Sequence, residues 1–206
     1  MNLSGCVALS RSPETGVWYR AIQPQFWQTS LATAQTRVLP SRFNEGSLAR
    51  PQFEVLYLAE TLIVALFEVQ AVFGVPTQPG GVIANPRRPW SVINVQFHLQ
   101  DVADLTHVSQ QTLLATTAQE LTSDGQGYQQ RNALTSVSEP VGAAPTQLLG
   151  AALFTVSGLE GFVTPSAPLP YNKNLIVFPQ KLRQGSRVEF HDAATGQHVV
   201  IAPPPP

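Results

Sequence analysis

Residues 92–99 alternate between apolar and polar side chains along the whole segment. Because successive side chains of a strand point to opposite faces, this alternation predicts a strand with one buried face. The face expected in the core carries Ile93, Val95, Phe97 and Leu99, and the polar face carries Asn94, Gln96 and His98. A second strand is predicted at residues 55–59, where the run Val-Leu-Tyr-Leu-Ala is the clearest strand pattern in the first half of the chain.

A helix is predicted to follow this second strand directly, over residues 61–73. Thr61 is a suitable cap for its first turn, and Gly74 is a suitable residue for its end. The segment is apolar on every face, and Glu68 is its only charged residue. A helix of that kind is expected to be buried, which makes a carboxylate within it unusual.

The rest of the pattern predicts short elements of both kinds. Strands are expected at residues 16–22, 162–163, 175–178, 187–190 and 197–201, helices at 145–154 and over part of 101–121, and loops or short turns at 24–50, 74–91 and 122–144. Strands and helices mix without strict alternation, which is typical of the α+β class. We expect one domain over residues 17–202, with a loose lead-in at 1–16 and a proline tail at 203–206.

Composition limits the classes of protein to which the chain can belong. Of its 206 residues, 43% are hydrophobic and 12% are charged, which is typical of a chain that packs a core. The low charge content favours a surface that a partner covers in part. The formal net charge of −1 supplies no basic field, so direct binding to nucleic acid is not expected.

The sequence also predicts a cytoplasmic location. The longest apolar run, residues 62–67, is far shorter than the roughly 20 residues of a membrane-spanning helix. Only five residues precede Cys6, too few for a lipoprotein leader. Cys6 is the single cysteine, so an internal disulfide is excluded.

Several common catalytic motifs are absent from the sequence. It contains no glycine-rich dinucleotide-binding turn, no phosphate-binding P-loop and no GxSxG nucleophile motif. Its histidines are His98, His107, His191 and His198, and they show no metal-ligand spacing. We therefore expect neither a metal nor a bound cofactor.

Five short motifs occur in a fixed order between about Trp18 and Phe178. They are the turn Ser41-Arg42-Phe43-Asn44-Glu45-Gly46, the strand Leu56-Tyr57-Leu58-Ala59, Glu68 eleven residues after Tyr57, the strand Gly161…Pro165-Ser166-Ala167, and Asn174-Leu175…Phe178. In this order the chain resembles the RES domain, which is named for its arginine, glutamate and serine. Two features differ: the gap between Arg42 and Tyr57 is longer than usual, and Pro168 stands where the family often carries an arginine.

The resemblance implies a fold related to ADP-ribosyltransferases, with a small curved mixed sheet flanked by helices. It implies a toxin of a bacterial toxin–antitoxin pair that acts on NAD+ as its substrate, and a helix-turn-helix antitoxin of the Xre type as its partner. By the same match, the catalytic residues are Arg42, Tyr57, Glu68 and Ser166, and Arg20 joins Arg42, Tyr57 and Ser166 in binding NAD+. A homo-oligomer or a toxin–antitoxin hetero-oligomer fits this class of protein.

The chemistry of NAD+ explains why a site that acts on it would contain these residue types. The planar guanidinium of an arginine such as Arg42 pairs with the oxygens of a pyrophosphate. Cleavage of the N-glycosidic bond passes through an oxocarbenium-like state, which the carboxylate of Glu68 would stabilise. Tyr57 would stack on the nicotinamide, and Ser166 would form a hydrogen bond to the substrate rather than act as a nucleophile.

Each residue also has an ordinary structural interpretation. On pattern alone, Arg42 is a solvated loop arginine, Tyr57 is a core tyrosine, and Glu68 joins its helix to a loop through an ion pair. Ser166 would be a turn serine, Arg20 would form a structural ion pair, and Lys173 and Asn174 are interpreted as turn residues.

Three functions therefore stay open at this stage. The first is cleavage of NAD+, with water or inorganic phosphate as the acceptor of ADP-ribose. The second is transfer of ADP-ribose to a protein. The third is a non-catalytic module that binds an antitoxin-like partner.

Overall fold

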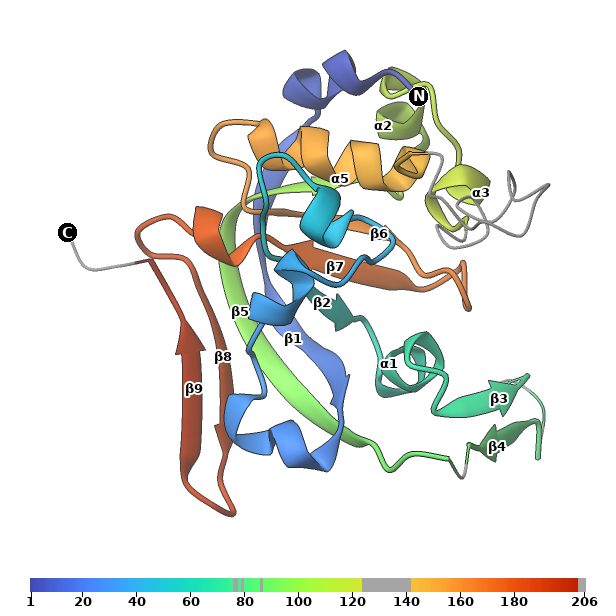
Figure 1. Cartoon of the computed structure of the whole chain (residues 1–206), viewed down its shortest axis with the longest axis vertical. Coiled ribbons are helices and arrows are strands. Elements are labelled where there is room, and N and C mark those ends of the chain that lie inside the picture. The colour runs from blue at the N-terminus through green and yellow to red at the C-terminus, as the bar shows by residue number, and fades with distance from the viewer. Residues whose placement is uncertain (76–77, 79, 86, 124–141, 204–206) are drawn as a thin grey trace.

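Long antiparallel strands dominate the architecture of the protein, which was obtained as a computed structural model describing residues 1–75, 78, 80–85, 87–123 and 142–203. The main sheet has seven strands in the order β1-β2-β7-β6-β5-β8-β9, and β1 also pairs with β5. These strands are β1 (Arg11–Ile22), β2 (Leu56–Ala59), β5 (Ser91–Asp104), β6 (Gly161–Pro165), β7 (Lys173–Val177), β8 (Arg187–Asp192) and β9 (Gln197–Ile201). Because β1 pairs with both β2 and β5, the first five strands of that order form a closed ring, and β8–β9 extends from it as a hairpin (Figure 1).

The alternating segment is the central strand of the fold. β5 pairs with β1 along almost its whole length, from Ser91 opposite Ile22 to Ala103 opposite Arg11. The predicted apolar face is buried, since Ile93, Val95, Phe97 and Leu99 are each at most 4% exposed. The strand predictions near residues 16–22, 55–59, 162–163 and 175–178 and the terminal hairpin are confirmed, although β1 and β5 are longer than their patterns indicated.

The first sixteen residues are not a loose lead-in. Residues Leu3–Ala8 form the 3₁₀ helix η1, and β1 already begins at Arg11. Cys6 and Leu9 are buried in the same apolar cluster as Leu149 and Leu153 of α5 (Pro145–Thr155). These apolar side chains anchor the segment in the core, although its many small polar residues had indicated a loose structure.

The helix after β2 is shorter than predicted. Thr61 does cap it, with its Oγ1 atom accepting from the backbone N–H of Val64 at 3.3 Å, but α1 (Leu62–Glu68) ends at Glu68. Gln70 has a positive φ of 54°, which breaks the helix. The β-branched and aromatic residues beyond it form β3 (Val72–Gly74), which pairs with β4 (Val82–Ala84) in the segment predicted to be loop.

The expectation that this helix is buried on all sides is also wrong. Val64 and Ala65 are buried, whereas the side chain of Leu62 is 48% exposed. Phe73, at the predicted end of the helix, is 49% exposed. The helix and the β3–β4 hairpin lie together at one side of the molecule (Figure 1), and both carry exposed apolar side chains.

Short helices fill the remaining connections, in the segment 24–50 that was predicted as loops or short turns, in the segment 101–121 that was predicted as partly helical, and near residue 180. They are η2 (Pro24–Thr29), η3 (Ala34–Arg37), η4 (Gly46–Leu48), α2 (Val108–Leu113), α3 (Ala118–Leu121) and η5 (Pro179–Lys181). The helix predicted at 145–154 is α5, with Pro145 in its first turn. Most of the loop predicted at 122–144 and all but the first residue of the proline tail lie outside the described residues. The fold is thus a single α+β domain with a curled mixed sheet, as expected.

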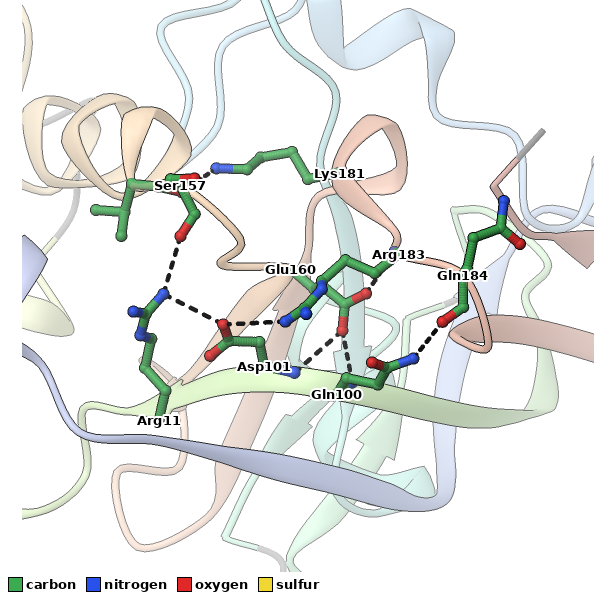
Figure 2. Close-up of polar contacts among 9 residues, drawn as sticks. Arg11, Gln100, Asp101, Ser157, Glu160, Lys181, Arg183 and Gln184 are labelled. Atoms are coloured by element: carbon green, nitrogen blue, oxygen red, sulfur yellow. Dashed lines mark hydrogen bonds and ion pairs between the residues drawn. The ribbon is translucent and has the colours of Figure 1, made fainter. Parts of the chain in front are cut away.

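A buried glutamate fixes the point at which β5 changes partner. β5 pairs with β8 at residues 96–98 and with β6, in parallel, at residues 102–104. In the stretch between these pairings, three steps along β5 lie opposite only two steps along its partner β1. β5 therefore has one extra residue there, which is a β-bulge. The carboxylate of Glu160 accepts the backbone N–H groups of Gln100 and Asp101 there, at 2.5 and 3.1 Å, and that of Arg183 at 2.6 Å (Figure 2).

Charged side chains surround this buried carboxylate and join three segments. Asp101 contacts the guanidinium groups of Arg11 and Arg183, at 3.2 and 3.6 Å (Figure 2). Arg11 also donates to the carbonyl oxygen of Ser157 at 3.0 Å, and the ammonium of Lys181 donates to carbonyls at the end of α5. These contacts hold β1, β5 and the end of α5 together.

Candidate functional site

Glu68 is the last residue of α1 and accepts hydrogen bonds from three side chains. Its Oε2 atom lies 3.3 Å from Nη2 of Arg42. Its Oε1 atom accepts from the hydroxyl of Ser166 at 2.8 Å and from the amide of Asn174 through a short hydrogen bond. Ser166 follows β6 and Asn174 lies in β7, so donors from two paired strands and one turn fix the orientation of this carboxylate.

Arg42 lies in a tight turn that carries it toward α1. Ser41 and Asn44 close the turn as a two-residue bridge, with N···O distances of 2.7 and 3.3 Å. The guanidinium is mostly buried, with 16% of the side chain exposed. Its Nη1 atom is buried and has no hydrogen-bond partner among the residues that the structure describes, so it remains as a donor for a ligand.

Tyr57, in β2, forms hydrogen bonds to this turn. Its hydroxyl oxygen lies 3.0 Å from Oγ of Ser41 and accepts the backbone N–H of Phe43 at 3.1 Å. Those two residues flank Arg42 in the sequence. Burial raises the pKa of the Tyr57 hydroxyl above its usual value, which keeps the group protonated at neutral pH.

Arg20 in β1 supplies a second guanidinium. Its Nη2 atom donates to the carbonyl oxygen of Ala32 at 3.2 Å, while Nη1 is buried and has no partner in the described part of the chain. Burial lowers the pKa of Arg20 to about 10. A buried guanidinium without a counterion is costly, and an anionic ligand would remove that cost.

These side chains meet at one cavity of about 370 Å³. This volume falls within the range of about 300–1,000 Å³ that is usual for small-molecule sites. The residues around it are Tyr19, Arg20, Ala21, Thr36, Ser41, Arg42, Val55, Tyr57, Leu58, Ala59, Ala65, Glu68, Val69 and Asn174. The structure thus brings four of the predicted site residues, Arg20, Arg42, Tyr57 and Glu68, to the same cavity.

Ser166 takes a different place from the other predicted residues. It is fully buried, at 0% exposure, and does not belong to the residues that line the cavity. Its hydroxyl proton is directed at Glu68. In this arrangement Ser166 orients the carboxylate from behind, whereas direct contact with a substrate stays a prediction.

Asn174 lines the cavity, although the sequence pattern indicated a turn residue. It is 3% exposed, and its amide donates to Glu68. Its Oδ1 atom has no hydrogen-bond partner within the described residues. The sequence did contain one indication of this role. Asn174 is a polar residue at the start of the fully apolar run Leu175-Ile176-Val177-Phe178, and a polar group in a buried strand needs a hydrogen-bond partner.

The arrangement combines one carboxylate with two guanidinium groups on an otherwise largely apolar wall. The free Nη1 atoms of Arg20 and Arg42 suit an anion such as a phosphate. The oriented carboxylate of Glu68 suits a neighbouring centre on which positive charge develops. One site can therefore bind an anionic group and stabilise a cation beside it.

Comparisons with known proteins agree with this reading of the fold. The family model described as RES domain matches residues 17–199. One solved structure that resembles the chain is a chain of the crystal structure of the M. tuberculosis MbcT-MbcA toxin–antitoxin complex, with a TM-score of 0.59 and 17% identity over 97% of this chain and 91% of that one. No curated protein matches the chain in sequence. In the part of the chain that the structure describes, no helix is long and apolar enough to cross a membrane.

Proposed function

Since this chain belongs to the RES-domain family, we propose that it is the toxin of a bacterial toxin–antitoxin pair and that it consumes NAD+. The observation that carries the proposal is the position of Glu68 and Arg42, which lie 3.3 Å apart at one cavity with the second guanidinium, Arg20, on the same wall. NAD+ offers an anionic pyrophosphate and a sugar carbon that becomes cationic, and the site has a group for each.

In the proposed reaction the bond between the ribose C1 carbon and the nicotinamide nitrogen breaks. Its electron pair leaves with nicotinamide, which becomes neutral, and the ribose becomes an oxocarbenium-like cation. The carboxylate of Glu68 stabilises that cation. An acceptor with a hydroxyl, either water or inorganic phosphate, then attacks the C1 carbon and loses its proton.

The arginines would hold the substrate for this step. The unpaired Nη1 atoms of Arg20 and Arg42 donate to pyrophosphate oxygens, while Nη2 of Arg42 keeps its contact with Glu68. Arg42 then links the anion to the carboxylate, so that binding energy at the phosphates positions the sugar. Tyr57, at the same cavity, offers an aromatic face to the nicotinamide.

The direct test is to incubate the purified protein with NAD+ and measure free nicotinamide. Glu68→Gln keeps the size of the side chain but removes its charge, so we expect it to remove most of the turnover. The matched control is Glu14→Gln, which changes a carboxylate on β1 outside the cavity lining and should leave turnover unchanged. Near wild-type turnover in a folded Glu68→Gln variant would rule out this role.

The same assay distinguishes the acceptors. Adding inorganic phosphate changes the product from ADP-ribose to its phosphorylated form if phosphate is the acceptor, and has no effect if water is. Labelled ADP-ribose on a protein in a cell extract would instead identify a transferase. A folded protein that releases no nicotinamide under any of these conditions would favour the non-catalytic module.

A partner that covers the cavity is the second part of the proposal. A toxin that consumes NAD+ needs to be blocked in the cell that makes it. The exposed side chains of Leu62 on α1, Phe73 on β3 and Ile83 on β4 suit a protein partner. We expect a helix-turn-helix antitoxin of the Xre type. Expression of the wild type alone should stop bacterial growth and deplete NAD+, whereas Glu68→Gln should do neither. Normal growth with unchanged NAD+ would count against the toxin.

A further inference from the structure

Helix α5 lies outside the cavity lining but directly contacts the turn that carries Arg42. Gln147, in its first turn, is 2% exposed. Its Nε2 atom donates to the carbonyl oxygens of Ser41 and Asn44, at 3.0 and 3.4 Å. These are the two residues that close the turn around Arg42, so one side-chain amide spans the base of the turn.

The orientation of this amide is itself fixed. Oε1 of Gln147 accepts the backbone N–H of Ala144, the N-cap residue of α5, at 3.0 Å. The amide therefore completes the helix cap with its oxygen and holds the turn with its nitrogen. A rotation of the side chain would leave buried groups at both ends without partners.

Gly150, three residues further along α5, brings the helix backbone against the same turn. A Cβ atom at Gly150 would lie 1.9 Å from the carbonyl oxygen of Phe43 and 2.8 Å from its carbonyl carbon. Only glycine permits this approach. Positions i and i+3 lie on one face of a helix, so Gln147 and Gly150 together form a flat support for the residues on both sides of Arg42.

The hydroxyl of Tyr57 holds the same turn through two further hydrogen bonds, one with the hydroxyl of Ser41 and one with the backbone N–H of Phe43. The turn that carries Arg42 is thus held between β2 and α5, and from this turn its guanidinium contacts Glu68. We propose that Gln147 is a positioning residue, which sets the place of Arg42 from outside the cavity. This inference rests on the proposed function, in which Arg42 binds the substrate.

The test replaces the donor of Gln147 while keeping its acceptor. Gln147→Glu still accepts from Ala144 but turns a carboxylate oxygen toward two carbonyls, which should push the turn away. We expect kcat/KM for NAD+ to fall about 10-fold, mostly through KM, because a small displacement of a binding group is enough for such a loss. The matched control is Gln119→Glu on the exposed face of α3, which should change neither constant.

A double-mutant cycle separates positioning from a general structural role. If Gln147 acts through Arg42, adding Gln147→Glu to Arg42→Ala should cause no further loss of kcat/KM, because the group being positioned is gone. Multiplied losses would overturn the inference. Gln147→Met, which has similar size and no donor, provides the same comparison if the glutamate variant fails to fold.

Hydrogen exchange gives a readout that does not depend on activity. In Gln147→Glu, the amides of residues 41–46 should exchange faster, including the Phe43 amide that donates to Tyr57, while those of β5 stay protected. Unchanged exchange in the turn would overturn the inference even if turnover fell. If the wild type releases no nicotinamide but the exchange result holds, the proposed function fails and the support of the turn by Gln147 stands.

Discussion

Ser166 and Asn174 share one acceptor, since both donate to the Oε1 atom of Glu68. Asn174 lies in β7, and Ser166 directly follows β6, the strand that pairs with β7. Because Thr164 of β6 lies opposite Asn174 in this antiparallel pair, Ser166 and Asn174 are close together. The second carboxylate oxygen is left for Arg42. The two oxygens of Glu68 are thereby differentiated: one is fixed by neutral donors of the sheet, and the other faces a charged group that also serves the cavity.

Replacing Asn174 by alanine should lower kcat rather than raise KM. The variant removes a donor from Glu68 but leaves both arginines in place, so we expect kcat to fall about 10-fold or more with little change in KM. Steady-state kinetics with NAD+ checks this. Ser166→Ala should reduce the effect of a second change at Asn174, because both act on one oxygen. A rise in KM alone would mean that Asn174 contacts the substrate and does not orient Glu68.

Arg42→Ala should raise KM and lower kcat together. The free Nη1 atom is lost as a phosphate donor, and Glu68 loses its charged partner. Arg42→Lys should restore little, because a single ammonium cannot contact both a phosphate and Glu68 in the geometry of a planar fork. The measurement is kcat and KM for all three proteins. Full restoration by lysine would show that only the charge matters.

Tyr57→Phe tests the hydroxyl separately from the ring. The change leaves the Phe43 N–H and the Ser41 hydroxyl without their partner, which should cost about 1–3 kcal/mol of unfolding free energy. We also expect a lower kcat/KM, because the turn around Arg42 is released. Denaturant unfolding and kinetics together decide the matter. Unchanged kinetics in the destabilised variant would limit Tyr57 to stacking and core packing.

Glu160→Gln should destabilise the fold without touching the cavity. The carboxylate of Glu160 is fully buried and accepts three backbone N–H groups, whereas an amide has one acceptor oxygen. We expect a loss of about 2–4 kcal/mol in unfolding free energy. Glu189→Gln on β8, whose carboxylate contacts Arg187 at the surface, should cost less than about 1 kcal/mol. Equal costs would contradict the role of Glu160 at the bulge.

Alkaline pH should destabilise the protein through Cys6. Burial raises the pKa of its thiol from 9.0 to about 11, so the unfolded chain ionises first as the pH rises. The contribution of the neutral thiol to stability is therefore fully present below pH 9 and is lost between about pH 9 and 11. The loss is about 3 kcal/mol at most, since each pKa unit corresponds to about 1.4 kcal/mol. Cys6→Ala should show a flatter curve over this window in denaturant unfolding. Parallel curves for the two proteins would contradict the shift.

The sequence predicted the strands better than the segment around Glu68. Alternation identified β5 because one of its faces is buried and the other is not. The stretch from Leu62 to Phe73 is apolar throughout, so its pattern could not separate a short helix from the strand that follows. The break depends on Gln70 in a left-handed conformation, which nothing in its residue type indicates.

Some residues of the candidate site were likewise predictable from the sequence and others were not. The order of motifs placed Arg42, Tyr57 and Glu68 together, and the structure brings them to one cavity. Asn174 belonged to the last motif but was interpreted as a turn residue, and Gln147 gave no signal. Both roles depend on contacts between residues about 100 positions apart in the chain. Glu160 was missed for a related reason. Flanked by Leu159 and Gly161, it resembles a turn residue until the bulge of β5 is known.

The closed ring of strands has a consequence for the timing of activity during synthesis. Glu68 and Arg42 are made early, but Ser166 and Asn174, which complete the carboxylate's hydrogen bonds, come about 100 residues later. A nascent chain lacking β6 and β7 therefore lacks both neutral donors of Glu68 and the strands that close the ring. The lining of the cavity includes Asn174, so the site cannot be completed before that residue has been synthesised. Under the proposed function, a shorter nascent chain therefore does not yet consume NAD+.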